Sequence, residues 1–305
     1  MNGRRKFLKG AALLSVLPAI SLDTFASVAP VAASGKFRVI TANIRVDLKE
    51  DDEKGLGWKS RKELCIEVIK KYNPDLVGFQ EVFYQQAIDL RNAFKDYYFL
   101  NYDGPEMAGV TEYAGIAKNP LLIKKSRFEL LTVGSYWLSE TPQIAGSEAW
   151  GTYRARHVNY AILKDQVTGK TFRFLNTHLT TNKAKVAKNK QIEMIVADAN
   201  QYKADFPQIL TGDFNSAPTS DTIKIATDNK FIDGFAAING TENQGATGHE
   251  FLGDKYQEVK KKLGNRIDYI FTKGNVKAVT CALIKDKKKE MYPSDHYFMY
   301  ADVEI

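Results

Sequence analysis

Six short segments of this chain carry β-branched and aromatic residues in runs that are apolar almost throughout. Such runs predict β-strands, and runs without strict polar alternation are typical of strands buried on both faces. The sheets of this protein therefore need a covering layer on each side. The six segments are Phe37–Ile44, Asp75–Gln80, Val158–Leu163, Thr171–Thr177, Gln208–Gly212 and Ile267–Thr272.

Helical patterns separate some of these strands. The segment Trp58–Lys71 places its apolar residues on one side and ends before Asn73-Pro74, a stop signal for a helix. Lys183–Lys203 and Ser220–Asn229 follow the same period. Many strands and few helices predict two packed sheets covered by helices, an α+β sandwich. A doubly wound parallel sheet is the alternative, but it requires more crossover helices, and no glycine-rich phosphate loop is present.

The first 33 residues differ from the rest. A basic start, a short apolar run and the small residues of Phe25–Ala33 predict an export signal at 1–33. The run RRKFLK matches the twin-arginine pattern of proteins that are exported folded, which predicts a periplasmic or extracellular location. Cleavage after Ala26 and cleavage after Ala33 both fit, and the apolar run is too short for a stable membrane anchor.

No linker, repeat or low-complexity tract divides the remaining chain, so residues 36–305 are expected to form a single domain. The predicted signal contributes a net charge of +3 to the total of +7, which leaves +4 and mildly favours an anionic substrate. Cys65 and Cys281 are the only cysteines, and the sequence fits a disulfide as well as two buried thiols. The oligomeric state stays open.

Polar residues that bind metals or transfer protons recur where apolar strands end. One acid at a strand end is commonplace, but several in one chain are hard to explain as loop chemistry. Rigid strands can hold such side chains together, and neighbouring carboxylates then need a cation. The residues are Asn43, Glu81, His178, Asp213, Asn215, Asp268, Asp295 and His296.

These side chains predict a magnesium-dependent phosphoesterase. Oxygen ligands without a thiolate or histidine cluster favour a hard cation, Mg²⁺, with Mn²⁺ or Ca²⁺ as alternatives. Hydrolysis also needs a base for water and a group that neutralises the developing oxyanion. Asp213 is the expected base, and His296, held by Asp268, is the expected donor to the phosphate.

Five motifs in order resemble the endonuclease/exonuclease/phosphatase superfamily, whose members share a deoxyribonuclease-I-like fold. The resemblance runs from Phe37 to the carboxyl terminus. It implies a four-layer α/β/β/α sandwich of two mostly antiparallel sheets, and Mg²⁺-dependent hydrolysis of phosphodiesters or phosphomonoesters. The motifs are GFQE (78–81), NTHL (176–179), GDFNS (212–216), RIDYIF (266–271) and SDH (294–296).

The resemblance implies a role for each matched residue. Glu81 matches the principal metal ligand, with Asn43 beside it as a metal ligand and phosphate contact, and Asp295 matches a residue near the metal. Asp213 and Asn215 match the residues that orient the attacking water and the transition state.

The remaining matches concern the phosphate. His178 matches a phosphate-contacting histidine, and Asp268 matches the partner of the terminal histidine, His296. Arg156 stands where many members carry a phosphate-facing arginine before a strand. His249 resembles a Thr-x-His histidine of related chains that lines the substrate pocket, although an exposed loop histidine fits the sequence equally well.

The substrate is less constrained than the reaction. The segment Phe128–Pro142 resembles an uncharacterised bacterial group, but Thr180-Thr181 replace a common Asp-His pair. Nucleic acid and small sugar or inositol phosphates both stay open, and a phospholipid is less favoured because no long apolar hairpin is present. Lysines at 183, 185, 188 and 190 fit either a solvated helix face or attraction to a phosphate backbone. A non-catalytic ligand-binding protein on the same fold is the alternative from another class.

Overall fold

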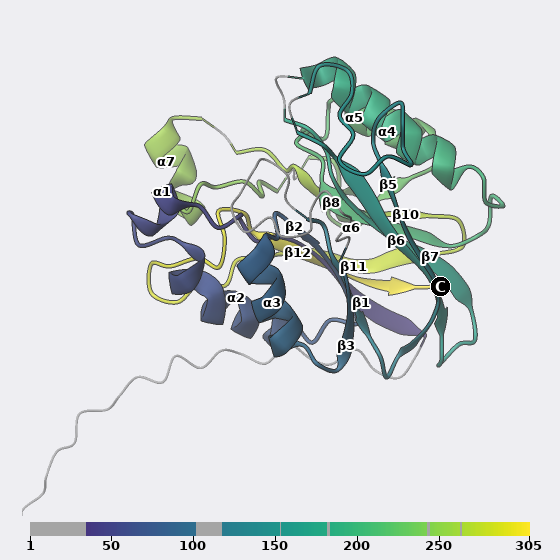
Figure 1. Ribbon diagram of the computed structural model, residues 1–305, viewed down its shortest axis with the longest axis horizontal. Helices are drawn as coiled ribbons and strands as arrows, with labels where there is room; N and C mark the ends of the chain where they lie inside the picture. The colour runs from purple at the N-terminus through teal and green to yellow at the C-terminus, as the bar shows by residue number, and fades with distance from the viewer. Residues whose placement is uncertain (1–34, 102–117, 153, 182–183, 243–244, 263) are drawn as a thin grey trace, which may run out of the picture.

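The computed structural model describes residues 35–101, 118–152, 154–181, 184–242, 245–262 and 264–305. The export signal expected at 1–33 lies outside these residues and stays a prediction (Figure 1). In the described ranges, no helix combines the length and apolar character needed to cross a membrane.

Two six-stranded sheets form the centre of the molecule. The first has the order β11-β12-β1-β2-β4-β3, and the second has the order β5-β6-β7-β8-β10-β9. Only the β1–β2 and β7–β8 pairs are parallel among the described strands, so both sheets are mostly antiparallel. The strands of the first sheet are β1 (Lys36–Asn43), β2 (Leu76–Gln80), β3 (Tyr97–Leu100), β4 (Leu121–Lys124), β11 (Lys277–Ile284) and β12 (Phe298–Glu304). Those of the second are β5 (Phe128–Trp137), β6 (His157–Asp165), β7 (Thr171–His178), β8 (Gln208–Asp213), β9 (Ile232–Asp233) and β10 (Asp268–Lys273).

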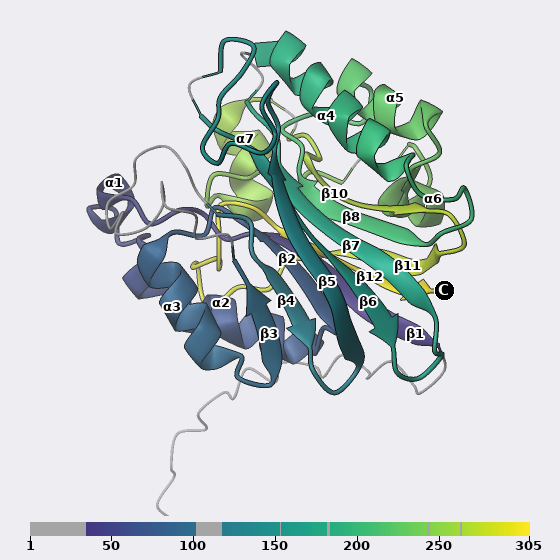
Figure 2. The ribbon, with the colours of Figure 1, turned by 45° about the vertical axis from the view of Figure 1, so that its right-hand side comes forward.

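Helices cover the outer faces of both sheets (Figure 2). The apolar side of α2 and α3 packs on the first sheet, and that of α4 and α5 packs on the second. A third apolar cluster fills the space between the sheets. The predicted sandwich is therefore confirmed, with four layers. The helices are α1 (Lys49–Asp52), α2 (Trp58–Tyr72), α3 (Tyr84–Ala93), α4 (Lys185–Ala199), α5 (Asp221–Asp228), α6 (Gly234–Asn239) and α7 (Tyr256–Lys260), with a 3₁₀ turn η2 (Gly253–Lys255) before α7.

The space between the sheets changes character from one end to the other. In β7, Phe172 and Phe174 lie in the apolar cluster between the sheets, whereas Asn176 bonds to polar groups of the first sheet and His178 ends the strand. Because alternate residues of a strand share a face, these four side chains point toward the same interior. Polarity therefore increases along the interior toward the strand ends that carry the predicted site.

A buried polar layer joins the two sheets just below that end. Asn176 Oδ1 accepts hydrogen bonds from Gln80 Nε2 (2.7 Å) and Thr211 Oγ1 (3.0 Å), and Asn176 Nδ2 donates to the Phe79 carbonyl (2.6 Å). Each of these residues is fully buried. Hydrogen-bonded groups in a dry interior fix geometry, because a shifted partner is left unsatisfied. The layer therefore fixes one sheet relative to the other directly beneath the site.

Replacing Gly78 by alanine is expected to destabilise the protein by about 1–3 kcal/mol, the usual cost of overpacking. A methyl group there would lie 2.1 Å from Thr211 Oγ1 and 2.6 Å from Asn176 Oδ1, inside the polar layer. Urea unfolding of Gly35→Ala, whose methyl group meets Thr168 Cγ2 at 3.2 Å, is the control. An unchanged unfolding midpoint for Gly78→Ala would show that the layer adapts freely.

Both cysteines are buried free thiols. Cys65 lies on α2 in the cluster under the first sheet, and Cys281 lies on β11 in the cluster between the sheets. The structure therefore agrees with two small buried side chains and contains no disulfide between them.

Candidate active site

The register of the second sheet places three predicted site residues in one row. His178 of β7 pairs with Asp213 of β8, and Asp213 pairs with Asp268 of β10. Paired residues of neighbouring strands direct their side chains to the same face. The three side chains therefore meet at one end of the interior, although 90 residues of sequence separate the first from the last.

The first sheet supplies Asn43 and Glu81 from the carboxyl ends of the parallel strands β1 and β2. Glu81 has a φ of 61°, in the left-handed region that non-glycine residues seldom adopt. Strand alternation alone would direct this residue toward the helices, since Gln80 already faces the interior. The left-handed turn instead brings the Glu81 carboxylate beside Asn43, whose Nδ2 donates to Glu81 Oε1 (3.2 Å) and to Asp213 Oδ2 (3.0 Å).

Glu81, His178 and Asp213 fit a divalent cation. Each offers a ligand atom within 4.8 Å of the others. Burial, and then the charge of Asp268, raise the pKa of Asp213 to about 7, with a further contribution from Glu81. Asp268 Oδ1 is buried and accepts no hydrogen bond from a described residue. Buried, mutually repelling carboxylates with unsatisfied oxygens form the environment that a hard cation stabilises.

Asn43 differs in one respect from its predicted role. Its amide nitrogen faces the two carboxylates, and its Oδ1 accepts from the Arg45 backbone N–H (3.0 Å). In this arrangement the amide acts as a donor that separates two negative groups. Ligation of a metal by the Asn43 oxygen stays a prediction.

Asp268 and His296 form the predicted pair. His296 Nδ1 lies 2.8 Å from Asp268 Oδ2, and Ser294 Oγ fixes the preceding turn by donating to the Asn43 carbonyl (2.7 Å). Burial opposes protonation of His296, but the adjacent Asp268 carboxylate outweighs it and raises the pKa of His296 well above its ordinary value. The Asp268 carboxylate therefore favours the protonated form of His296, which can donate from its other ring nitrogen.

His178 has the opposite character. Burial, followed by the positive charge of Arg156, holds the pKa of His178 well below its ordinary value. Its Nε2 lies 3.0 Å from Asn215 Nδ2 and 3.4 Å from Asp213 Oδ2. Asn215 is itself left-handed, with a φ of 47°, and its N–H donates to Asp213 Oδ1 (2.8 Å). The site therefore combines His178, whose surroundings favour a neutral imidazole, with His296, whose surroundings favour a charged one.

Two arginines that the sequence analysis did not identify support the site. Arg45 lies 3.6 Å from Asp295 Oδ2 and also pairs with Asp51 (2.8 Å). Arg61 is fully buried and donates to the carbonyls of Ile44 (2.9 Å) and Pro293 (2.7 Å), next to the two loops that carry Asn43 and Asp295.

His249 is not an exposed loop residue. Its side chain is 2% exposed and packs against Tyr292 and Tyr297, with ring centroids 4.9 and 4.2 Å away. Its backbone N–H donates to the Asp295 carbonyl (2.8 Å), and its Nδ1 accepts from the Gly253 N–H (3.2 Å). The residue lies beside the segment that holds His296, and its contact with substrate stays a prediction.

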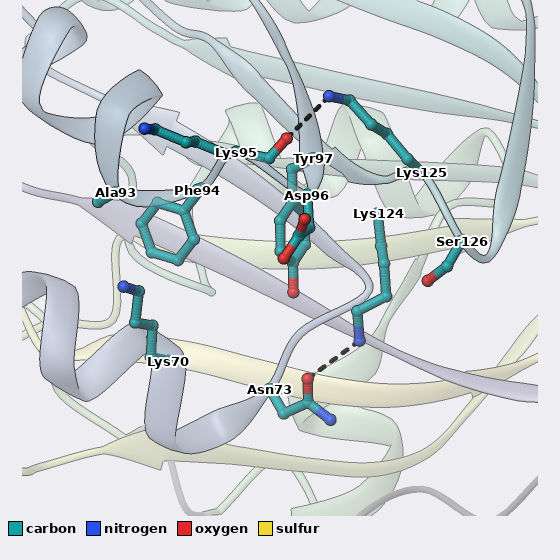
Figure 3. A pocket seen from close by; sticks show the side chains of 10 residues that line it. All are labelled: Lys70, Asn73, Ala93, Phe94, Lys95, Asp96, Tyr97, Lys124, Lys125 and Ser126. Carbon is teal, nitrogen blue, oxygen red and sulfur yellow. Dashed lines mark hydrogen bonds between the residues drawn. The ribbon is translucent and has the colours of Figure 1, made fainter.

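A cavity of about 530 Å³ lies elsewhere, at the start of β2 and so at the strand end opposite Glu81 (Figure 3). Lysines line much of it, but Lys124 Nζ donates to Asn73 Oδ1 (3.0 Å), and Lys125 Nζ donates to the Lys95 carbonyl (2.8 Å). None of the predicted site residues lines this cavity.

The sequence model of the Endonuclease/Exonuclease/phosphatase family matches residues 40–296. The chain belongs to this family. The match contains every residue of the site, from Asn43 to His296, and members of the family are hydrolases that act on phosphate esters.

Several known proteins are similar to the chain. Protein angel of Drosophila melanogaster is 26% identical over 177 residues, which are 55% of this chain but only 47% of that protein's length. The crystal structure of an endonuclease/exonuclease/phosphatase from Bacteroides vulgatus is 27% identical, with a TM-score of 0.76, and the match covers 88% of this chain and 99% of that one. A mannosyl-6-phosphatase from Bacteroides thetaiotaomicron, 21% identical with the same TM-score, covers 88% of this chain and 100% of its own and shares the fold.

Proposed function

We propose that this protein hydrolyses phosphate esters and depends on a divalent cation, with Mg²⁺ as the expected ion. The observation that carries the proposal is the convergence of carboxylates and imidazoles from both sheets. Asp213 belongs to two clusters of side chains that could hold a metal ion. One contains Glu81 and His178, and the other contains Asp268 and His296. A non-catalytic ligand-binding protein on the same fold would not need side chains for metal binding, water activation and charge neutralisation in one site.

Each residue has a proposed role in the reaction. Asp213, with its pKa raised to about 7, accepts the proton of the attacking water at neutral pH. His296 donates a hydrogen bond to the phosphate, and Asp268 holds its ring and its charge. Asn215 and His178 lie together on the other side of Asp213 and contact the phosphate oxygens.

Glu81 and Asp295 would hold the cation, with Asn43 beside them and the Asp213 carboxylate facing it. His178 lies close enough to Glu81 and Asp213 to be a ligand, but we assign it to the phosphate. A bound divalent ion supplies charge neutralisation at the phosphoryl oxygens. Arg156, whose charge acts on His178, adds a fixed positive group near the same position. The proposed substrates are phosphodiesters or phosphomonoesters, nucleic acid or a small ester, with a phospholipid as the less favoured alternative. The fold shared with a mannosyl-6-phosphatase makes sugar phosphates a sensible first set to assay.

Release of p-nitrophenol from its phosphate monoester and from bis-p-nitrophenyl phosphate tests the proposal. We expect turnover with Mg²⁺ and none after EDTA, and Mn²⁺ and Ca²⁺ identify the preferred ion. Sugar phosphates, inositol phosphates, DNA, RNA and sphingomyelin then compare the substrate classes. If no substrate is cleaved with any of the three ions, the protein is not the proposed hydrolase.

Replacing Glu81 by Gln should raise the Mg²⁺ concentration needed for half-maximal activity by about tenfold or more, as expected when a ligand or its support is lost. It should also reduce the increase in Tm that Mg²⁺ causes. Glu129→Gln is the matched control, because Glu129 lies on β5 with a side chain that is 54% exposed. Equal Mg²⁺ dependence in both variants would exclude Glu81 as a ligand.

A further inference from the structure

Two lysines of helix α4 have very different surroundings. The side chain of Lys185 is 69% exposed and pairs with Asp221 (2.7 Å) at the surface. Lys188, one turn later, is 3% exposed, and its ammonium donates to the Asn215 carbonyl at 2.6 Å. The basic stretch seen in the sequence is therefore not one solvated face, because one of its lysines reaches the back of the site.

The Asn215 peptide is a sensitive place for such a contact. The residue is left-handed, and its conformation directs Nδ2 to the Leu179 carbonyl (3.0 Å) and to His178. Its N–H, in the preceding peptide unit, bonds to Asp213 Oδ1, so the backbone conformation of Asn215 sets the position of both side chains. Left-handed residues persist where surrounding contacts determine them. The Asp213 contact fixes the peptide unit before the Asn215 Cα, and the Lys188 contact fixes the unit after it through the Asn215 carbonyl.

A buried ammonium is costly unless nearby groups compensate for lost hydration. Here burial lowers the pKa of Lys188 to about 8, and the Asn215 carbonyl and the negative charge of Asp213 compensate in part. A methionine of similar length would satisfy packing on α4 without this cost. A charged group at a buried helix position, with its ammonium on the Asn215 carbonyl, therefore points to a role in the site.

We propose that Lys188 is a positioning residue: its ammonium holds the Asn215 peptide so that the Asn215 amide stays beside His178 and the phosphate. This inference rests on the proposed function. Lys188 itself touches no reacting atom, and it acts through Asn215.

Three variants test this role in the full chain. We expect Lys188→Met to lower kcat by about 10- to 100-fold with KM nearly unchanged, the usual range for residues that support a site. Lys188→Arg should recover most of the loss, since a guanidinium also donates to a carbonyl. Lys185→Met removes the same charge from the same helix and should behave like the wild type. Near-normal kcat in Lys188→Met, or equal losses in both methionine variants, would overturn the proposal.

A second measurement does not depend on turnover. In ¹⁵N spectra of the substrate-free protein, Lys188→Met should shift the Asn215 side-chain amide and the His178 ring nitrogens, whereas Lys185→Met should not. Unshifted Asn215 signals in Lys188→Met would refute the positioning role. If the methionine variant does not fold, Lys188→Gln takes its place. A wild type that cleaves nothing refutes the hydrolase, and the spectra still decide the role of Lys188.

Discussion

Asp213→Asn is expected to lower kcat by about 10³-fold, within the range for removal of a positioned base. Asparagine has the same shape, but its single amide oxygen can accept only one of the hydrogen bonds that Asn43 Nδ2 and the Asn215 N–H donate to Asp213. It also cannot accept the proton of the attacking water. The loss also removes one of the carboxylates that would face the cation. Initial rates with bis-p-nitrophenyl phosphate at saturating Mg²⁺ measure the effect.

Stability separates this loss from unfolding. Burial and neighbouring carboxylates raise the pKa of Asp213, so its ionisation opposes folding as the pH rises from about 4 to about 7. In EDTA at neutral pH, Asp213→Asn should therefore melt at the same temperature as the wild type or higher. Asp228→Asn, at an exposed helix position, is the control for activity. A fall in Tm together with the loss of activity would indicate a structural role instead.

Most strands of the site could be predicted because they are buried on both faces. The sequence segments 171–177 and 208–212 coincide closely with β7 and β8, since continuous apolar runs leave few alternatives. Among the strands that were not predicted, β5 is partly exposed and has mixed polarity, and β3, β4 and β9 are only two to four residues long. The strands β11 and β12 were not predicted either. The helix expected to end at Lys203 stops at Ala199, and the chain then turns into the Tyr202–Phe206 stack.

The geometry of the site could be predicted only in part. Motif order identified Asp213 and His178, but their pairing depends on the strand register, which no local signal determines. The left-handed conformation of Glu81 could not be predicted from the sequence either, because strand alternation predicts the opposite direction for its side chain. Such strain is stable only where tertiary contacts impose it, here from the Val46 N–H and Asn43 Nδ2.

The two buried basic residues that support the site, Arg61 and Lys188, could have been recognised from the sequence. Arg61 shares the apolar side of α2 with Leu64, and Lys188 shares that of α4 with Ile192, at helical spacing. The charged group of a basic residue in such a stripe needs hydrogen-bond acceptors inside the protein, because it is shielded from water. Both reach backbone carbonyls in loops next to site residues, which makes a cation within an apolar stripe a useful sign of loop support.

His296→Gln is expected to lower kcat by about 10²- to 10³-fold, the scale for loss of a preorganised donor to developing charge. Glutamine retains a donor but not the positive charge that Asp268 maintains on the ring. Asp268→Asn should cause a smaller loss, since the ring remains but its charge and orientation weaken. Because Asp268 acts through His296, the double variant should be no slower than His296→Gln alone. Losses that multiply in the double variant would show that the two side chains act independently, and Asp268 would then need a separate role, such as binding the cation through Oδ1.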